Sequence, residues 1–349
     1  MGMVSHYLGI AFCCQVHKCG AITVHLSQSA YIDLLLERFY LQHCKHATTP
    51  YRMGLPIDMI PHQHLDMTTK THLTKDIWCI VGPLNWLALV TWPDISTTVS
   101  LLAQHQNDPS HRHLQAAKYV LQYLKSSRDY CISYSSFPNQ SSLESFINFP
   151  LNPSQITSFA DANWDPQDQT IPTPNKIPPE LHPFTVCSVS GNLSSILGGH
   201  LEWQSGRQKL TARSSTEAEI YATDQCTKKL LQLLHILTDI NRLDILPLPT
   251  NIFCDNSSCV QCSKNTTTKS LRHTTIREIA VRESAINNII KVLKIDGRLN
   301  PSDIFTNEFK DQKHFLNLRD SILTLLPKTI ISYPSNLSAP IAYKINSLI

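Results

Sequence analysis

The stretch S-S-T-E-A-E-I-Y-A-T-D-Q-C-T-K-K-L-L-Q-L-L-H-I-L (214–237) decides the fold, because it predicts one long helix over 216–240. Ser214 and Glu217 have the spacing of a capping box at its start. Small and apolar residues recur every three or four positions and form the predicted buried face: Ala218, Ala222, Cys226, Leu230, Leu233 and Leu237. Glu219 lies beside that face, where a carboxylate needs a partner to offset its desolvation.

Strand-like segments lie on both sides of this helix. Apolar and β-branched runs predict strands at 156–160, twice within 184–203, at 251–254 and at 289–295. A proline-rich loop at 166–183, a second helix over 276–286 and a segment over 301–307 complete the unit. Three strands, a helix and then alternating strands and helices predict the α/β class, with a mixed sheet covered by helices.

The first 135 residues predict a separate α+β unit. Alternating residues over 7–26 predict a hairpin that turns at 17–20. Helices are predicted over 27–39 with Ser27 as N-cap, over 77–89, and from Asp108 and Pro109 onward, with an extended connection at 44–75. Prolines among Ser and Asn residues predict a linker. We therefore divide the chain into 1–135, a linker at 136–155, a second unit at 156–310, and a C-terminal helix and tail at 311–349.

The composition favours a folded intracellular protein. Hydrophobic residues make up 42% of the 349 residues, which excludes wholesale disorder. The formal net charge of +3 is only mildly basic, so nucleic-acid binding would depend on local clusters of Lys and Arg. No signal peptide is recognisable, and no apolar run approaches the ~20 residues that span a bilayer.

The eleven cysteines do not form a disulfide framework, and they indicate a reducing compartment. Cys254, Cys259 and Cys262 have a C-x4-C-x2-C spacing that could suggest metal ligands. No matching second pair exists, so buried small side chains are the favoured interpretation.

Four acids are candidate ligands for a hard divalent cation. Asp161 and Asp255 each follow a predicted strand, where ligand sites of α/β sheets lie, while Glu219 lies inside the long helix and Asp303 begins the 301–307 segment. Two Mg²⁺ ions about 4 Å apart, held by such carboxylates, can hydrolyse a phosphodiester. The alternative is that each Asp only caps a turn or a helix, with Asp303 as an N-cap.

Several motifs of the second unit resemble those of the ribonuclease H domain in copia-type LTR retrotransposon polyproteins. They are S-F-A-D-A-N-W (158–164), V-S-G (189–191), G-G-H-L-E-W-Q-S-G-R-Q (198–208), A-R-S-S-T-E-A-E-I-Y-A (212–222), F-C-D-N (253–256), L-R-H-T-T-I-R-E (271–278) and D-I-F-T (303–306). The resemblance implies a ribonuclease H-like mixed five-stranded sheet with flanking helices. It assigns metal binding and catalysis to Asp161, Glu219, Asp255 and Asp303, with two Mg²⁺ ions or, alternatively, Mn²⁺ as cofactors. Glu217 is the capping residue in this reading.

The first unit resembles the end of the reverse transcriptase of the same polyproteins, a partial thumb and connection region. The matching motifs are H-Y-L-G-I (6–10), L-S-Q-S-A-Y-I (26–32), I-V-G-P-L-N-W-L (80–87), T-W-P-D-I (91–95) and H-L-Q-A-A-K-Y-V-L-Q-Y-L (113–124). The polymerase Asp-Asp pair of that family occurs nowhere in this chain. The resemblance implies an RNA·DNA hybrid as substrate, the upstream polymerase and integrase parts as partners, and a location in cytoplasmic particles or the nucleus, without a membrane.

Basic residues around the acids are candidate nucleic-acid contacts. They are Arg207, Lys209, Arg213, Arg272, His273 and Arg277, of which Arg272 and His273 match the family's K/R-H. For Arg277 and Arg282 the alternative is a solvated helix face with Glu278 and Glu283 as neighbours.

Three positions depart from the family pattern, so a decayed copy is an alternative. Trp92 replaces an Arg, Ser302 an Ala and Asn307 a Lys. The leading hypothesis is a metal-dependent ribonuclease H. The alternatives are a remnant that binds nucleic acid without turnover, and a structural fragment that is stable only when docked on polymerase domains.

Overall fold

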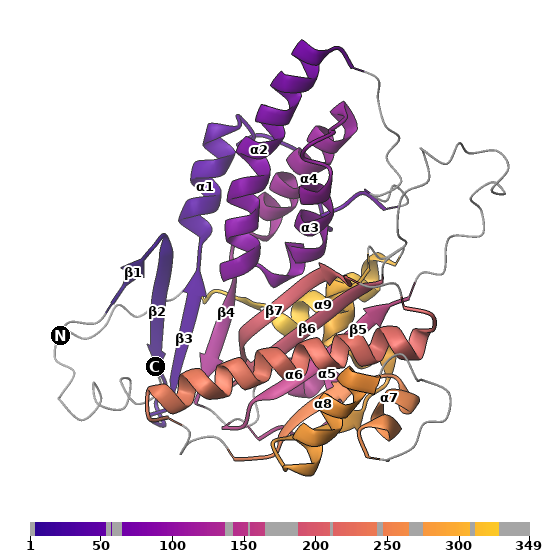
Figure 1. Cartoon of the computed structure of the whole chain (residues 1–349). Helices are drawn as coiled ribbons and strands as arrows, with labels where there is room; N and C mark the ends of the chain where they lie inside the picture. Colours follow the sequence, from indigo (N-terminus) through magenta and orange to yellow (C-terminus); the bar gives the residue numbers. More distant parts are fainter. Residues whose placement is uncertain are drawn as a thin grey trace, which may run out of the picture.

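The computed structural model describes residues 4–53, 57, 65–136, 142–152, 154–164, 188–209, 212–242, 247–264, 275–307 and 311–327. Within these ranges the chain forms two five-stranded sheets with helices packed on them (Figure 1). The predicted α/β class is confirmed. The predicted proline-rich loop at 166–183 lies outside the described residues. In the ranges described, no helix has the length and apolar character that a membrane span requires.

The first sheet joins strands from distant parts of the chain. Its order is β1-β2-β3-β4-β10, and each neighbouring pair is antiparallel. The strands span His6–Tyr7, Ile10–Val16, Ile22–Ser27, Tyr130–Ser135 and Thr324–Leu325. β2 and β3 form the predicted hairpin, in whose turn Gly20 has a φ of +84° that favours glycine. Because β10 pairs with β4, the chain returns to its first sheet after completing the second.

Four helices pack together beside this sheet (Figure 1). They are α1 (Ser29–Arg38), α2 (Met67–Val90), α3 (Ser96–Gln104) and α4 (His111–Ser127). The sequence of α4 has apolar residues at a 3.6-residue spacing, of which Ala117, Val120, Leu121 and Leu124 have no exposed surface, while Leu114 is partly buried. The helices are therefore held by their apolar faces rather than by intrinsic propensity.

Two of these helices begin at residues other than the predicted ones. Gln28, not Ser27, is the N-cap of α1, and no side chain caps that helix. At α4 the N-cap is Ser110 instead of Asp108, because Ser110 and His113 form a capping box in which the Ser110 N–H donates to the Nδ1 of His113 at 3.0 Å. The prediction at both sites was wrong by one or two residues.

Helix α2 is longer than predicted. The Asp66 side chain accepts a hydrogen bond from the Thr69 N–H at 3.0 Å and caps a helix that begins at Met67. The end of the predicted extended connection at 44–75 is therefore helical. Pro83 lies inside α2, which nevertheless continues to Val90 because its Ile80, Leu84 and Leu87 are buried.

The second sheet is the expected mixed one. Its order is β7-β6-β5-β8-β9, in which β5, β6 and β7 are antiparallel neighbours, whereas β8 runs parallel to β5 and β9. The strands span Thr157–Asn163 (β5), Val189–Ile196 (β6), Gly199–Arg207 (β7), Thr250–Cys254 (β8) and Ile290–Lys294 (β9).

The long helix α6 (Ser215–Asp239) lies across one face of this sheet, with α7 (Ser257–Cys262) and α8 (Thr275–Ile286) beside it (Figure 1). Cys226, Leu230 and Ile252 belong to the buried cluster on this face. The apolar spacing of the long helix therefore predicted the buried face as far as Leu230. Beyond it, Leu234 is buried, whereas the predicted Leu233 and Leu237 are only partly buried.

The opposite face of the second sheet packs on the N-terminal helices. Phe159 and Phe253 belong to the same buried cluster as Leu84 and Leu121. The Trp203 indole N–H donates to the Ala88 carbonyl at 2.6 Å. The two predicted units therefore share one core.

The predicted linker at 136–155 contains the short helix α5 (Ser142–Ile147), which packs against α9 (Gln312–Ile322). In turn, Phe315 of α9 contacts Tyr51 and Tyr123 edge-on at centroid distances of 5.8 and 6.0 Å. The C-terminal helix thus packs on the first unit, while the predicted domain limits themselves stay a prediction.

Candidate metal centre

Asp161 lies within strand β5, whereas the sequence analysis predicted that it directly follows a strand. It pairs with Gly191 in the antiparallel β5–β6 ladder, which continues to Asn163. The parallel β5–β8 ladder, however, stops at Ala160 and Cys254. Asp161 therefore occupies the position where the neighbouring strand β8 ends, and Asp255 follows directly after that end.

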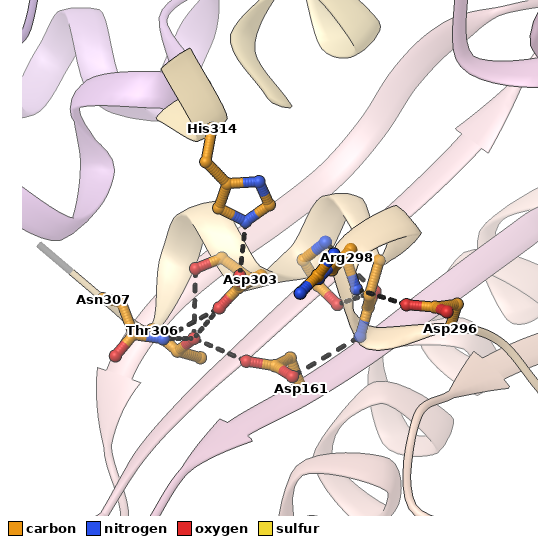
Figure 2. Close-up of polar contacts among 9 residues, drawn as sticks. Asp161, Asp296, Arg298, Asp303, Thr306, Asn307 and His314 are labelled. Atoms are coloured by element: carbon orange, nitrogen blue, oxygen red, sulfur yellow. Dashed lines mark hydrogen bonds and ion pairs between the residues drawn. The ribbon is translucent and has the colours of Figure 1, made fainter. Parts of the chain in front are cut away.

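The Asp161 carboxylate is buried and held by neutral donors. Its Oδ2 accepts a hydrogen bond from the Thr306 hydroxyl at 2.5 Å, and its Oδ1 lies 3.5 Å from the Asn300 amide nitrogen (Figure 2). Burial, followed by the charges of Asp303 and Asp255, raises its pKa to about 8. A buried carboxyl whose pKa is raised in this way is a candidate for a functional site.

Glu219 lies one turn inside α6 and is only 6% exposed. Its Oε1 accepts a hydrogen bond from the Ala162 N–H at 3.3 Å, and the Cys254 thiol lies 3.7 Å from its Oε2. Burial and the charge of Asp161 raise the pKa of Glu219 well above its usual value. The carboxylate predicted to need a partner thus lies beside other acids.

Asp255 and Asp303 are the other two acids of the group. Burial raises the pKa of Asp255, and the Lys294 ammonium partly offsets this effect. Asp303 lies in the 3-10 segment η7 (Pro301–Phe305), whose N-cap is Asn300, so the alternative that Asp303 serves as the N-cap is wrong.

Both carboxylate oxygens of Asp303 have hydrogen-bond partners. The Asn307 amide donates to Oδ1 at 2.8 Å, and the His314 Nε2 lies 3.1 Å from Oδ2 (Figure 2). The Thr306 hydroxyl lies 3.5 Å from Oδ1 and also binds Asp161. Thr306 therefore bridges the two acids.

The four predicted acids come together from four elements, β5, α6, the end of β8 and η7. Ligand atoms of Glu219 and Asp255 lie within 4.8 Å of each other. Thr306 links Asp161 to Asp303, and Ala162 links β5 to Glu219. Burial, followed by the charges of neighbouring carboxylates, raises the pKa values of Asp161, Glu219 and Asp255. A hard divalent cation bound by oxygen ligands would favour the charged forms of these acids. The residues present therefore fit such a cation.

The C-x4-C-x2-C spacing of Cys254 could suggest a metal ligand, although the favoured interpretation from the sequence is a buried small side chain. Three other residues of this region were not predicted from the sequence: Asn300, Thr306 and His314. The first two flank Asp303, so a search for polar neighbours of the acids would have found them. His314 carries no such signal, because only the packing of α9 brings it to Asp303.

Glu217 does not complete the predicted capping box. The Ser214 hydroxyl accepts from the Glu217 N–H at 3.2 Å, as predicted. The Glu217 carboxylate, however, accepts from the Arg213 N–H at 2.7 Å and from the Tyr221 hydroxyl at 2.6 Å. Its oxygens are thereby engaged at the start of α6, but not by the Ser214 N–H that a capping box requires.

Among the basic candidates, Arg207, Lys209 and Arg213 are exposed near the end of β7 and the start of α6. Arg272 and His273 lie outside the described residues. Arg277 is engaged within the protein. Its guanidinium lies 3.9 Å from the Tyr221 ring centroid, and its Nε lies 3.6 Å from the buried Asp224 carboxylate.

The predicted alternative of a solvated helix face is wrong for Arg282. This side chain is 14% exposed and forms an ion pair with Glu278, one turn earlier, rather than with Glu283. It also donates to the Cys262 carbonyl at 3.2 Å. The hydrogen bond from Arg282 to Cys262 therefore links α8 to the end of α7.

Two of the three departures from the family pattern are buried. Trp92 is 1% exposed and Ser302 has no exposed surface. The indole N–H of Trp92 and the Oδ1 of Asp94 have no hydrogen-bond partner among the described residues. Within the described ranges, Trp92 and Asp94 are thus buried with one unpaired polar atom each, an arrangement that costs stability.

These observations define an α/β protein with a carboxylate cluster suited to divalent cations at one end of a mixed sheet. The chain is similar to the retrovirus-related Pol polyprotein from transposon TNT 1-94 of Nicotiana tabacum, with 27% identity over 285 residues, or 80% of this chain. It is 28% identical to the corresponding polyprotein from transposon RE1 of Arabidopsis thaliana over 288 residues, or 81% of this chain.

A third relative is a putative transposon Ty5-1 protein of Saccharomyces cerevisiae, 33% identical over 139 residues, which are 39% of this chain and 41% of that protein. The chain spans only 19% and 17% of the two plant polyproteins. No protein-family model matches it. The comparisons support a retroelement protein related to retrotransposon Pol polyproteins.

Proposed function

We propose that residues 156–310 are a ribonuclease H-like domain that cleaves the RNA strand of RNA·DNA hybrids, as part of a retrotransposon reverse transcriptase. The grouping of Asp161, Glu219, Asp255 and Asp303 carries this proposal. They come from four elements and meet where β8 ends beside β5. The similarity to Pol polyproteins supports the same class of chemistry.

The cofactor in this proposal is a pair of Mg²⁺ ions, with Mn²⁺ as the alternative ion, held by the four acids. When bound, the ions would supply an activated water and stabilise the departing 3′ oxygen. The surrounding residues orient the ligands. Thr306 and Asn300 hold Asp161, while the Ala162 N–H holds Glu219.

The substrate in this proposal is an RNA·DNA hybrid bound through its phosphates. Arg207, Lys209 and Arg213 are exposed candidates near the start of α6, and Arg272 and His273 are candidates by resemblance. Arg277 is the weakest, because it already contacts Tyr221 and Asp224. The upstream polymerase and integrase parts are the proposed partners, in cytoplasmic particles or the nucleus.

The deciding experiment is Mg²⁺-dependent cleavage of a labelled RNA·DNA hybrid, with duplex DNA as control substrate. Asp161→Asn keeps the size of the side chain but removes its charge, so cleavage should fall by orders of magnitude. Asp239→Asn, at the exposed end of α6, is the matched control and should cleave like the parent. Equal activity of Asp161→Asn and the parent would contradict the enzymatic proposal, because a contaminating nuclease would then explain the cleavage.

A specific observation favours the alternative of a decayed remnant. Asn307 stands where the family has Lys, and its amide occupies an oxygen of Asp303. If the parent binds the hybrid but does not cleave it, the remnant is the correct description. Asn307→Lys should then strengthen hybrid binding, because it restores a cation beside the phosphate site.

A further inference from the structure

Cys254 lies among the acids of the candidate metal centre. It is the last residue of β8, directly before Asp255, and its side chain has no exposed surface. Its thiol points toward α6 and lies 3.7 Å from the Oε2 of Glu219. The predicted burial of the cysteine cluster is confirmed, but this one thiol also faces two carboxylates.

The spacing of these atoms matches a transition-metal site. One ligand atom each from Glu219, Cys254 and Asp255 lie within 4.8 Å of one another. In a tetrahedral zinc site with bonds of about 2.3 Å to sulfur and about 2.1 Å to oxygen, a sulfur and an oxygen ligand lie about 3.6 Å apart. The observed 3.7 Å between Cys254 and Glu219 therefore requires almost no rearrangement.

The chemistry of this donor set differs from that of the acids alone. Mg²⁺ takes oxygen ligands and gains nothing from a thiol, whereas Zn²⁺ and Cd²⁺ bind thiolate sulfur strongly. Asp255 is half-buried, so an ion could reach the cluster from its side. On binding, one sulfur–metal bond would form, and the thiol proton would pass to solvent.

We propose that Cys254, Glu219 and Asp255 form a binding site for a soft divalent cation such as Zn²⁺. This site shares two carboxylates with the proposed Mg²⁺ centre. Occupation by Zn²⁺ would therefore exclude Mg²⁺ and inhibit hybrid cleavage. Only this inhibition rests on the proposed function, since the binding itself depends on the three donors alone.

The experiment is a Cd²⁺ titration of the full chain, followed by the ultraviolet charge-transfer band of the cadmium–thiolate bond. In Cys254→Ser, the part of this absorption band that saturates at the lowest Cd²⁺ concentration should be missing. Cys226→Ser is the matched control, because Cys226 is also buried, on α6, but lies outside the three-donor group. It should keep the full band.

A second variant tests the shared carboxylate and protects the experiment against misfolding of Cys254→Ser. Asp255→Asn keeps the thiol, so the band should still form but should require more Cd²⁺. An unchanged band in Cys254→Ser, or an unchanged Cd²⁺ requirement in Asp255→Asn, would overturn the site. Cadmium binding through Cys254 without hybrid cleavage would support this site and count against the proposed ribonuclease. Hybrid cleavage without the Cys254-dependent band would support the ribonuclease and overturn this site.

Discussion

At the scale of single residues, burial decides how the acids of this protein behave. Asp161, Glu219 and Asp94 are at most 7% exposed, and the pKa of each is raised chiefly by burial. Asp161 and Glu219 lie in the candidate metal centre, where a cation could compensate them. Asp94 lies in the shared core, where it accepts a hydrogen bond from the Tyr123 hydroxyl and feels the charge of Arg319.

Asp94 should make the stability of the fold pH-dependent. Its pKa rises from 3.8 to about 6 in the folded protein, so its protonated form stabilises the fold below about pH 4. That contribution is lost as the pH rises through about 6. The free energy of unfolding of Asp94→Asn relative to the parent should therefore increase by about 2–3 kcal/mol from pH 4 to pH 8.

Urea unfolding of both proteins across this pH range measures the difference. Tyr123 can still donate to the Asn amide oxygen, so the hydrogen bond is retained. Parallel pH profiles for the two proteins would show that Asp94 does not titrate as described.

At the scale of elements, the metal centre depends on how closely η7 approaches β6. Gly191 of β6 faces η7, and a Cβ at this position would lie 2.6 Å from the Ser302 carbonyl oxygen and 2.9 Å from Phe305 and Thr306. Only glycine lets the segment that carries Asp303 lie directly on the sheet. The V-S-G motif is thus explained by packing.

Gly191→Ala should therefore displace η7 and destabilise the protein by about 1–3 kcal/mol, because the Ser302 carbonyl oxygen and the Phe305 Cβ block the new methyl group. Thermal unfolding measures the cost. Gly206→Ala, in β7, is the control, since its nearest neighbour would be a flexible Gln204 side chain at 3.5 Å. Equal melting temperatures for the two variants would contradict the close approach of η7.

At the scale of the whole molecule, the C-terminal elements tie the two sheets together. Helix α9 places Phe315 between Tyr51 and Tyr123, places His314 on Asp303, and leads into β10 of the first sheet. The candidate metal centre and the N-terminal core are therefore connected by one helix. This arrangement favours cooperative unfolding of the described residues as a unit.

Phe315→Ala should cost about 3–5 kcal/mol of stability, because it leaves a cavity at a side chain that is only 1% exposed. Asn317→Ala, on the exposed side of the same helix, should cost little. Denaturant unfolding followed by tryptophan fluorescence would report both. A small loss for Phe315→Ala would contradict the close packing of α9 on Tyr51 and Tyr123.

Mg²⁺ should stabilise the whole fold by binding only the native state. The melting temperature should rise with millimolar Mg²⁺ in the parent and rise less in Asp161→Asn, because the variant lacks one ligand charge. Differential scanning fluorimetry with Ca²⁺-free buffers measures the shift. No change in the parent would count against metal binding.

Local sequence patterns determined most elements of this protein. The 3.6-residue spacing predicted most of the buried faces of α4 and α6, with Leu114, Leu233 and Leu237 only partly buried. Alternation predicted the β2–β3 hairpin. Both patterns depend on residues that are close in sequence. The four acids were also found from sequence, through motifs that resemble a known family. The predicted helix starts were less accurate, because neighbouring residues compete as N-caps. Gln28 replaces the predicted Ser27 at α1, and Ser110 replaces the predicted Asp108 at α4.

Only the tertiary structure decided which distant residues meet. Cys254 faces Glu219, Thr306 bridges Asp161 and Asp303, and His314 reaches Asp303 because β8, η7 and α9 pack together. Likewise, β10 pairs with β4 across almost two hundred residues of chain. No local pattern encodes such contacts, because they arise from burying several apolar faces in one shared core.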